Sequence, residues 1–212
     1  MSIYKVFIQA RMNSSRFPGK VLAPLGGKPI ITHLVERVAS VFDRDNIVVL
    51  TSIQQSDDPL YYYLKATGVE VFRGELENTF NRFRDALLKY QCDAFFRICA
   101  DSPLLDTSLI TRMSEIYGKQ QPDLVTNVFP RTFPKGSSLE LVDSAVFADV
   151  DQSCLTTEDR EHVTTCFYRH HHNYRIENIE CDDEQKKSEN WAVDTIDDMK
   201  NVEQYLNKLT CS

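Results

Sequence analysis

Short apolar runs alternate with amphipathic stretches over the first 127 residues of the chain. The apolar runs are rich in β-branched and aromatic residues, as is typical of buried strands, and they cover residues 4–9, 46–51, 69–72, 93–99 and 123–127. In the stretches between and after them, apolar residues recur at helical spacing, in residues 29–42, 57–65, 78–90 and 106–116. Strands that alternate with helices in this way predict an α/β fold with a mainly parallel, doubly wound sheet.

This regular alternation ends near Val128. Residues 128–142 contain two prolines and a glycine, so we expect extended segments joined by turns. Three later segments have their own periodicity: a polar helix over 156–169, an exposed strand over 174–180 and a final helix over 195–209. The sequence has no internal repeat and no low-complexity linker. We therefore predict a single domain, residues 1–212, which carries a small inserted lid or dimerisation excursion at about 128–180.

Composition narrows the classes of protein to which the chain can belong. Hydrophobic residues make up 42% and charged residues 26%, which is ordinary for a globular protein with a buried core. The net charge of −7 argues against a general nucleic-acid surface, and no apolar run approaches the roughly 18 residues that span a bilayer. We therefore expect neither nucleic acid nor a membrane as a partner. The N-terminal residues lack a basic leader followed by a long apolar stretch, so we expect a cytoplasmic location.

A polar loop, QARMNSSRFPGKVL (residues 9–22), follows the first strand directly. In open α/β sheets, ligands bind beyond the carboxyl ends of the strands. Guanidinium, hydroxyl and ammonium groups that can hold phosphate oxygens come from Arg11, Ser14, Ser15, Arg16 and Lys20. The glycine spacing fits neither a Walker A loop nor a dinucleotide fingerprint. We interpret residues 11–20 as a phosphate-binding loop, with a solvated basic loop as the alternative.

The pattern QARxxSxRxPGKxL in this loop resembles the N-terminal motif of sugar nucleotidyltransferases of the acylneuraminate and 3-deoxy-manno-octulosonate cytidylyltransferase type. It is most similar to the branch named for spore-coat polysaccharide biosynthesis. Further similar blocks follow in the family's order: FRGELENTFNRF (72–83), RICADSPLLD (97–106), TNVFPRTFPKG (126–136), EDREHVT (158–164) and WAVDTIDD (191–198). The resemblance implies a Rossmann-like nucleotidyltransferase fold and dependence on Mg²⁺. It also implies a homodimer built partly by the excursion. Phe129, Phe133 and Phe147 are candidate apolar anchors for that interface, and the alternative is that they cover the main sheet.

The resemblance also implies roles for individual residues. Four residues match the family's triphosphate-binding loop: Arg11, Ser15, Arg16 and Lys20. Three residues in block 72–83 would lie near the base and ribose: Arg73, Gly74 and Arg82. A simple strand-to-helix turn is the alternative for that block. Arg16, Lys20 and Asp101 are the expected catalytic residues.

Asp101 and Asp194 match the family's metal-binding carboxylates. Each follows a short apolar run, which fits two strands that end on the same rim of the sheet. Magnesium is commonly held by one or two carboxylates together with substrate phosphates, so a shared ion requires the two carboxylates to lie within about 4–7 Å. Without metal, repulsion between them should raise the pKa of at least one. The alternative for Asp194 is a cap on the final helix.

These features predict that a sugar hydroxyl attacks the α-phosphate of CTP and releases pyrophosphate, in the synthesis of a surface polysaccharide. Two positions depart from the family pattern: Cys99 stands where some members have a glutamine that reads cytosine, and Ser138 where the spore-coat branch usually has an acidic residue. The identity of the nucleotide base therefore depends on position 99, and the identity of the sugar on position 138. His162 receives no role.

Two other functions compete with this prediction. A glycosyltransferase that uses a nucleotide-sugar would need a DxD motif at a strand end, but the DxD at 149–151 follows a helical segment and fits a polar helix end better. A non-catalytic subunit that binds a nucleotide or sugar is the second alternative. Consecutive histidines at 170–172 cannot all face one metal ion, and we interpret them as a solvated helix end.

Overall fold

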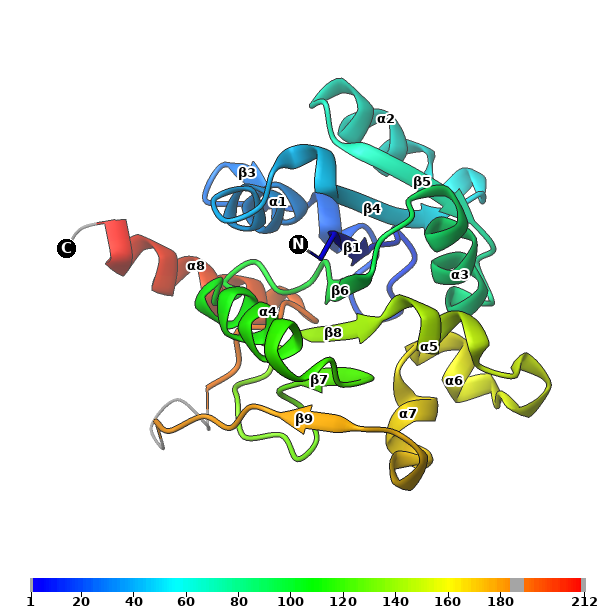
Figure 1. Ribbon diagram of the computed structural model, residues 1–212. Coiled ribbons are helices and arrows are strands. Elements are labelled where there is room, and N and C mark those ends of the chain that lie inside the picture. Colours follow the sequence, from blue (N-terminus) through cyan, green and yellow to red (C-terminus); the bar gives the residue numbers. More distant parts are fainter. Residues whose placement is uncertain (1, 184–188, 211–212) are drawn as a thin grey trace.

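The computed structural model describes residues 2–183 and 189–210 of the chain. Among these residues, seven strands form one sheet: β1 (Tyr4–Gln9), β4 (Ile47–Ser52), β5 (Glu70–Gly74), β6 (Ala94–Cys99), β7 (Leu124–Thr126), β8 (Glu140–Asp143) and β9 (Ile176–Asn178). Figure 1 shows them stacked in the order β5-β4-β1-β6-β8-β7-β9, from top to bottom. A separate small ladder joins β2 (Pro24–Leu25) to β3 (Lys28–Pro29).

The sheet is mainly parallel, as the alternation of strands and helices predicts. The neighbours β5-β4-β1-β6 are all parallel, and so is the pair β7-β9. The exception is β8, which runs antiparallel between β6 and β7. This strand was not predicted within the extended segments of residues 128–142, because its four residues include Glu140 and leave too short an apolar run to be recognised.

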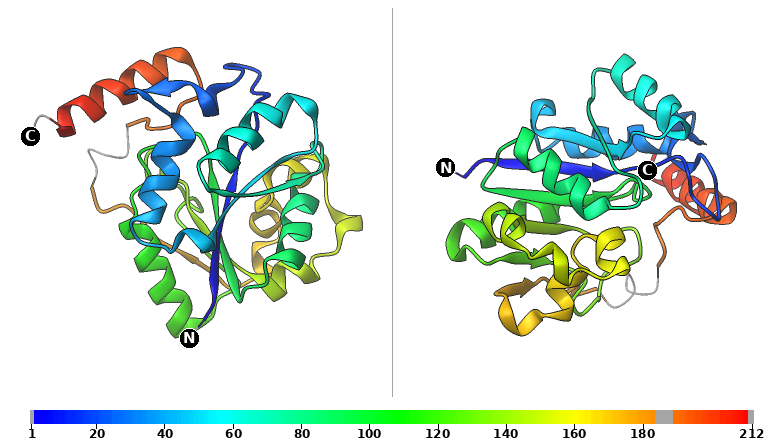
Figure 2. Two further views of the ribbon diagram at one scale, coloured as in Figure 1. Left: turned by 90° about the horizontal axis from the view of Figure 1, so that it is seen from above. Right: turned by 90° about the vertical axis from the view of Figure 1, so that its right-hand side faces the viewer.

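Helices cover both faces of the sheet. One apolar cluster joins the sheet to α1 (Ile30–Ala39), α2 (Asp58–Ala66) and α4 (Ser108–Gln120). The other cluster joins the opposite face to α3 (Thr79–Lys89), α5 (Ser144–Asp149) and α7 (Thr165–Arg169). The left view of Figure 2 shows α1 and α4 on one side of the strands and α3 on the other. No helix in the described part of the chain is long and apolar enough to cross a membrane.

One predicted helix is wrong in its extent. Residues 156–169 form two short helices, α6 (Thr157–His162) and α7, because Val163 between them takes a positive φ of 56°. The final helix, α8 (Ile196–Thr210), confirms the prediction for residues 195–209.

Phe147 is not available as an interface anchor, contrary to the expectation for the excursion. It is fully buried, with its ring centroid 4.4 Å from that of Phe80 and 5.1 Å from that of Phe95. Phe133 is only partly buried against the core, and Phe129 keeps 36% of its surface exposed. The excursion residues also supply β8, β9 and the helices α5 to α7 to the layers described above.

A tight backbone contact fixes the segment that carries Asp194. Gly136 has a φ of 86°, and a Cβ atom there would lie 2.3 Å from the backbone of Trp191 and Ala192. The Trp191 N–H donates to the Lys135 carbonyl at 2.7 Å, and the Val193 N–H donates to the Asp101 carbonyl at 2.9 Å. This segment therefore lies against the end of β6.

Gly136→Ala should destabilise the protein by about 1–3 kcal/mol, since the new methyl group meets backbone and the positive φ is unfavourable for alanine. Gly118→Ala is the matched control, because Gly118 lies in α4 with open space around its Cα. That change should be neutral or stabilise the protein by up to about 1 kcal/mol. Thermal unfolding measures both variants, and equal melting temperatures would contradict the proposed contact.

Candidate active site

A cavity of about 350 Å³ opens at the carboxyl ends of β1 and β6. These strands are hydrogen-bonded neighbours, and Gln9 lies opposite Cys99 where they end. The strand order reverses between them, since the chain continues from β1 to β4 and β5 on one side and from β6 towards β8 and β7 on the other. Such a reversal is where open α/β sheets bind ligands.

The structure brings together at this cavity all the loop residues and both carboxylates that the sequence analysis selected. The lining residues from the loop are Arg11, Ser14, Ser15, Arg16 and Lys20. Asp101, which follows β6, and Asp194, which precedes α8, line the same cavity. Residues distant in the sequence therefore meet at one rim of the sheet.

The loop is held in shape from below by a buried carboxylate. Asp57 has no exposed surface and accepts hydrogen bonds from the Met12 N–H at 2.7 Å and the Ser52 N–H at 3.0 Å. The loop then turns at Gly19, whose φ is 75° and whose N–H donates to the Met12 carbonyl. From the sequence, Asp57 was only the first residue of the helical stretch 57–65, and its part in shaping the loop becomes visible only because the structure shows it to be buried.

Lys20 lies between the two carboxylates. Its Nζ atom is 3.1 Å from Oδ2 of Asp101 and 2.9 Å from Oδ1 of Asp194. Two oxygens this close to one nitrogen are at most about 6 Å apart, a spacing that one magnesium ion with a bridging water can span. Arg16 adds a second ion pair, 3.0 Å from Oδ2 of Asp194.

This arrangement corrects the expectation of a raised carboxyl pKa. Partial burial raises the pKa of Asp194, but the hydrogen bonds and charges of Lys20 and Arg16 outweigh burial and hold it below the ordinary value of 3.8. The ammonium between the carboxylates replaces repulsion with attraction.

Asp194 does not cap the final helix, so that alternative is wrong. The cap is made by Thr195 and Asp198, since the Thr195 N–H donates to Asp198 at 2.8 Å and the Asp198 N–H donates to the Thr195 hydroxyl at 3.1 Å. The carboxylate of Asp194 remains directed at Lys20 and Arg16.

Arg73, Gly74 and Arg82 do not line this cavity, contrary to the expectation that they bind base or ribose. The Arg73 guanidinium donates to the carbonyls of Ser52 and Gln54 and pairs with the Asp58 carboxylate. The Arg82 guanidinium is buried and donates to two carbonyls of the turn after β5. Gly74 leaves room for Arg82, because a Cβ there would lie 2.8 Å from the Arg82 side chain. These contacts support the alternative of a strand-to-helix turn.

A buried polar network that was not predicted from the sequence lies beneath the cavity, and its members Gln9 and Arg97 line the cavity floor. Arg97 donates to Oε2 of Glu140 at 2.9 Å and to the Gln9 amide oxygen at 3.1 Å. Glu140 also accepts a hydrogen bond from the Thr164 hydroxyl at 2.7 Å. Burial raises the pKa of the neighbouring Cys99 thiol to about 11, so the thiol is neutral at pH 7. Arg97 could have indicated this network from the sequence, because it is a charged residue inside the apolar run FFRIC.

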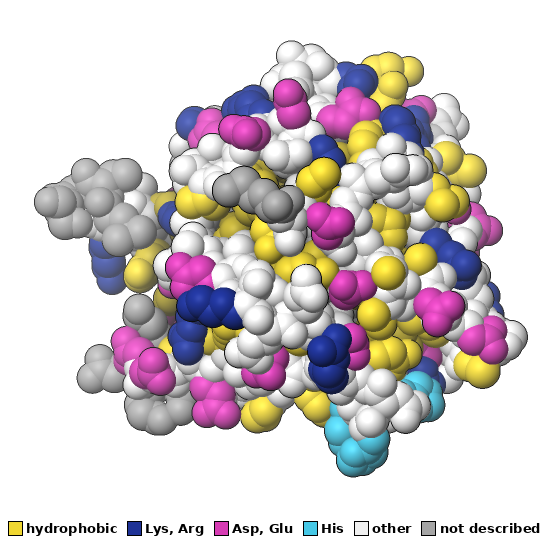
Figure 3. All heavy atoms as spheres, in the orientation of Figure 1, with side chains coloured by type: hydrophobic (Ala, Val, Ile, Leu, Met, Phe, Trp, Pro, Cys, Tyr) yellow, Lys and Arg dark blue, Asp and Glu magenta, His cyan; other side chains and the backbone are white. Residues whose placement is uncertain are grey.

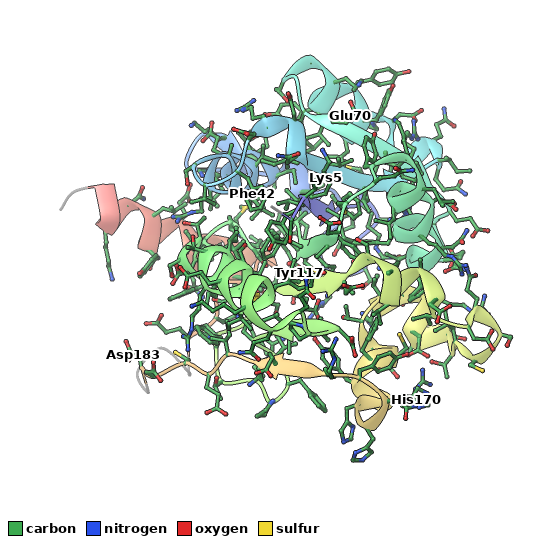
Figure 4. All side chains as sticks on the ribbon, in the orientation of Figure 1. Lys5, Phe42, Glu70, Tyr117, His170 and Asp183 are labelled. Carbon is green, nitrogen blue, oxygen red and sulfur yellow. The ribbon has the colours of Figure 1, made fainter. Side chains whose placement is uncertain are left out.

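The other candidate motifs lie elsewhere. The Asp151 carboxylate of the DxD motif accepts a hydrogen bond from the Ser153 N–H and so caps its own turn. The histidine run forms an exposed projection at the end of α7, visible in cyan at the bottom of Figure 3 and at the His170 label of Figure 4. Over residues 2–183 and 189–210, no three His, Cys, Asp or Glu side chains gather as a metal cluster.

A family model described as "Cytidylyltransferase" matches residues 6–208. The chain belongs to the cytidylyltransferase family. It is a nucleotidyltransferase, and the α/β fold described above is that of the family's solved members.

One relative and two solved structures are similar over most of the chain. Spore coat polysaccharide biosynthesis protein SpsF of Bacillus subtilis is 31% identical over 207 residues, which cover 95% of this chain and 85% of SpsF. A cytidylyltransferase structure from Leptospira borgpetersenii has a TM-score of 0.91 at 28% identity, over 98% of this chain and 88% of that one. The structure of CMP:2-keto-3-deoxy-manno-octonic acid synthetase complexed with CTP shares the fold, with a TM-score of 0.74 at 16% identity. It covers 98% of this chain and 100% of the other.

Lys20→Met should raise the pKa of Asp194, because Lys20 supplies the strongest of the interactions that lower it. A carboxyl with a lowered pKa stabilises the fold above its ordinary value of 3.8, and this contribution is lost as the pH falls through the lowered value. NMR titration of the Asp194 carboxyl carbon measures the shift. Lys28→Met is the control, since Lys28 pairs with Glu36. An unchanged Asp194 pKa in Lys20→Met would rule out the ion pair.

Proposed function

We propose that this nucleotidyltransferase transfers CMP from CTP to a hydroxyl of a sugar or sugar acid and releases pyrophosphate, in the synthesis of a surface polysaccharide. The observation that carries the proposal is the meeting of the loop cations with Asp101 and Asp194 in one cavity. SpsF, named for spore-coat polysaccharide, and the synthetase complexed with CTP support the nucleotide and the class of acceptor.

The proposed chemistry needs positioning and neutralised charge more than a covalent nucleophile. Arg11, Ser14 and Ser15 would hold the triphosphate, with Arg16 and Lys20 stabilising the charge that develops on the leaving pyrophosphate. Arg16 is the more accessible of the two cations, with 64% of its side chain exposed. Lys20 would exchange a carboxylate for phosphate oxygens when CTP enters.

Asp101 and Asp194 fit a Mg²⁺ site, because carboxylate oxygens are the ligands that the ion prefers and phosphates with water complete its shell. Their approach to one shared cation, Lys20, shows that two carboxylates and a positive charge are accommodated together. Bound Mg²⁺ would neutralise phosphate charge and lower the pKa of the attacking hydroxyl. Lys20 holds the two carboxylates at that spacing.

Pyrophosphate release tests the function. The wild type, supplied in turn with four nucleoside triphosphates and with 3-deoxy-manno-octulosonate or N-acetylneuraminate, should release pyrophosphate fastest from CTP. Faster turnover of GTP or UTP would contradict the proposed base. Sugar transfer from a finished nucleotide-sugar would favour the glycosyltransferase alternative, and CTP binding without turnover would favour the binding subunit.

Arg16→Ala and Lys20→Ala should each weaken CTP binding, since losing a charge-assisted contact costs about 1.5–3 kcal/mol, or roughly ten- to a hundredfold in affinity. Arg16→Ala is the cleaner variant, because Lys20 is nearly buried and its removal leaves two facing carboxylates. Calorimetric titration with CTP measures the loss, and Lys28→Ala is the control. Affinity equal to that of the wild type in both variants would remove the loop assignment.

We also propose a cytoplasmic homodimer in which the excursion at about 128–180 acts as a lid and dimer contact of a single domain, residues 1–212. Phe129 is the remaining exposed apolar anchor of the three. Light scattering at micromolar concentration should give about twice the chain mass of 24.4 kDa, and Phe129→Asp should lower it. Leu88→Asp, at an exposed position of α3, should not. A monomeric wild type would overturn this proposal.

A further inference from the structure

One wall of the cavity has no part in the reaction described so far. Glu161 and His162 are the last two residues of α6, and they line the same cavity as Lys20 and Asp101. The Arg11 guanidinium lies 2.9 Å from Oε1 of Glu161, so the end of α6 lies directly beside the loop. The cavity therefore has a cationic wall from the loop and a second wall of different chemistry from α6.

The chain around this second wall is firmly fixed. Thr156 and Asp159 form a capping box at the start of α6. Directly after His162, the fully buried Val163 takes a φ of 56°, a conformation that is rare for a β-branched residue. The next residue, Thr164, donates its hydroxyl to the buried Glu140. A chain held in this way keeps the end of α6 against the cavity and prevents it from continuing into α7.

The charges on the two walls suit different parts of a substrate pair. A triphosphate attracts the cations of the loop and is repelled by a carboxylate such as Glu161. A carboxylate beside an imidazole can accept and donate hydrogen bonds, which is what hydroxyl groups require. Both side chains can form further hydrogen bonds. Within the described ranges, the His162 ring has no hydrogen-bond partner, and of the two Glu161 oxygens only Oε1 accepts a hydrogen bond.

We infer that Glu161 and His162 form the acceptor subsite and bind hydroxyl groups of the sugar. This inference rests on the proposed function. The cations of the loop then face the nucleotide, and the acceptor lies between α6 and the carboxylates that follow β6 and precede α8. Arg11 links the two walls: when phosphates draw its guanidinium away, Oε1 of Glu161 becomes free for a hydroxyl.

Steady-state kinetics of Glu161→Gln and His162→Asn test the subsite, with matched controls Glu158→Gln on the exposed side of α6 and His170→Asn outside the cavity. The acceptor is 3-deoxy-manno-octulosonate or N-acetylneuraminate, whichever the wild type uses faster with CTP. Glu161→Gln should raise the KM for that sugar roughly ten- to a hundredfold, as expected for a lost hydrogen bond to a charged group. His162→Asn should raise it about two- to tenfold, as expected for a lost hydrogen bond between neutral groups. The controls should keep the wild-type KM.

Titration with CTP alone tests whether the α6 wall contacts the nucleotide or only the sugar. Glu161→Gln should bind CTP as tightly as the wild type or more tightly, because a negative charge near the triphosphate has been removed. Weaker CTP binding in both variants would place these residues on the nucleotide and overturn the subsite. If the wild type turns over and both variants keep its acceptor KM, only the subsite fails. If the wild type releases no pyrophosphate with either sugar, the proposed function fails and the subsite fails with it.

Discussion

The ammonium of Lys20 between Asp101 and Asp194 is the interaction on which the site depends. It joins three parts of the chain that are far apart in sequence: the loop after β1, the residue after β6 and the segment before α8. Two facing carboxylates would repel each other, and a nearly buried lysine alone would be costly to desolvate. The attraction between the ammonium and the two carboxylates offsets both costs. The charged groups of the site are therefore already in place when a ligand binds, and electrostatic catalysis requires no reorganisation of them.

The antiparallel strand β8 supports the floor of the cavity, which is lined by Arg97 of the neighbouring strand β6. It brings Glu140 opposite Arg97 on β6, in the interior of the sheet. A buried ion pair of this kind is weak evidence for stability, because desolvation offsets most of the attraction. Its effect here is geometric, since Glu140 also holds Thr164 and so connects the floor to the end of α6.

The sequence predicted the parallel core well because each strand and helix carries its own periodicity. Residues 4–9 match β1 at both ends, and residues 78–90 contain α3. It failed where tertiary contacts decide. The β8 strand is stabilised by neighbours on both sides, and α6 ends at His162 because Val163 takes a positive φ that no local signal marks.

The candidate site divides in the same way. Arg16 and Lys20 could be selected because cations after a first strand have a direct chemical meaning, whereas Arg73 and Arg82 have the same side chain but serve backbone carbonyls. Residue type and sequence spacing alone do not distinguish an arginine that lines the cavity from one that binds backbone carbonyls. Asp57 and Glu140 were missed because their significance lies in being buried, and burial of a single acidic residue cannot be seen in a sequence.

The burial of Cys99 has a consequence for the chemical durability of the enzyme. The thiolate is the form that alkylating agents and peroxides attack, and a pKa of about 11 leaves a fraction on the order of 10⁻⁴ as thiolate at pH 7. A cysteine on the floor of a cavity would ordinarily expose a catalyst to inactivation by oxidants. Here desolvation, together with the nearby carboxylates of Asp101 and Glu140, keeps the thiol in its neutral form, which reacts slowly with alkylating agents and peroxides.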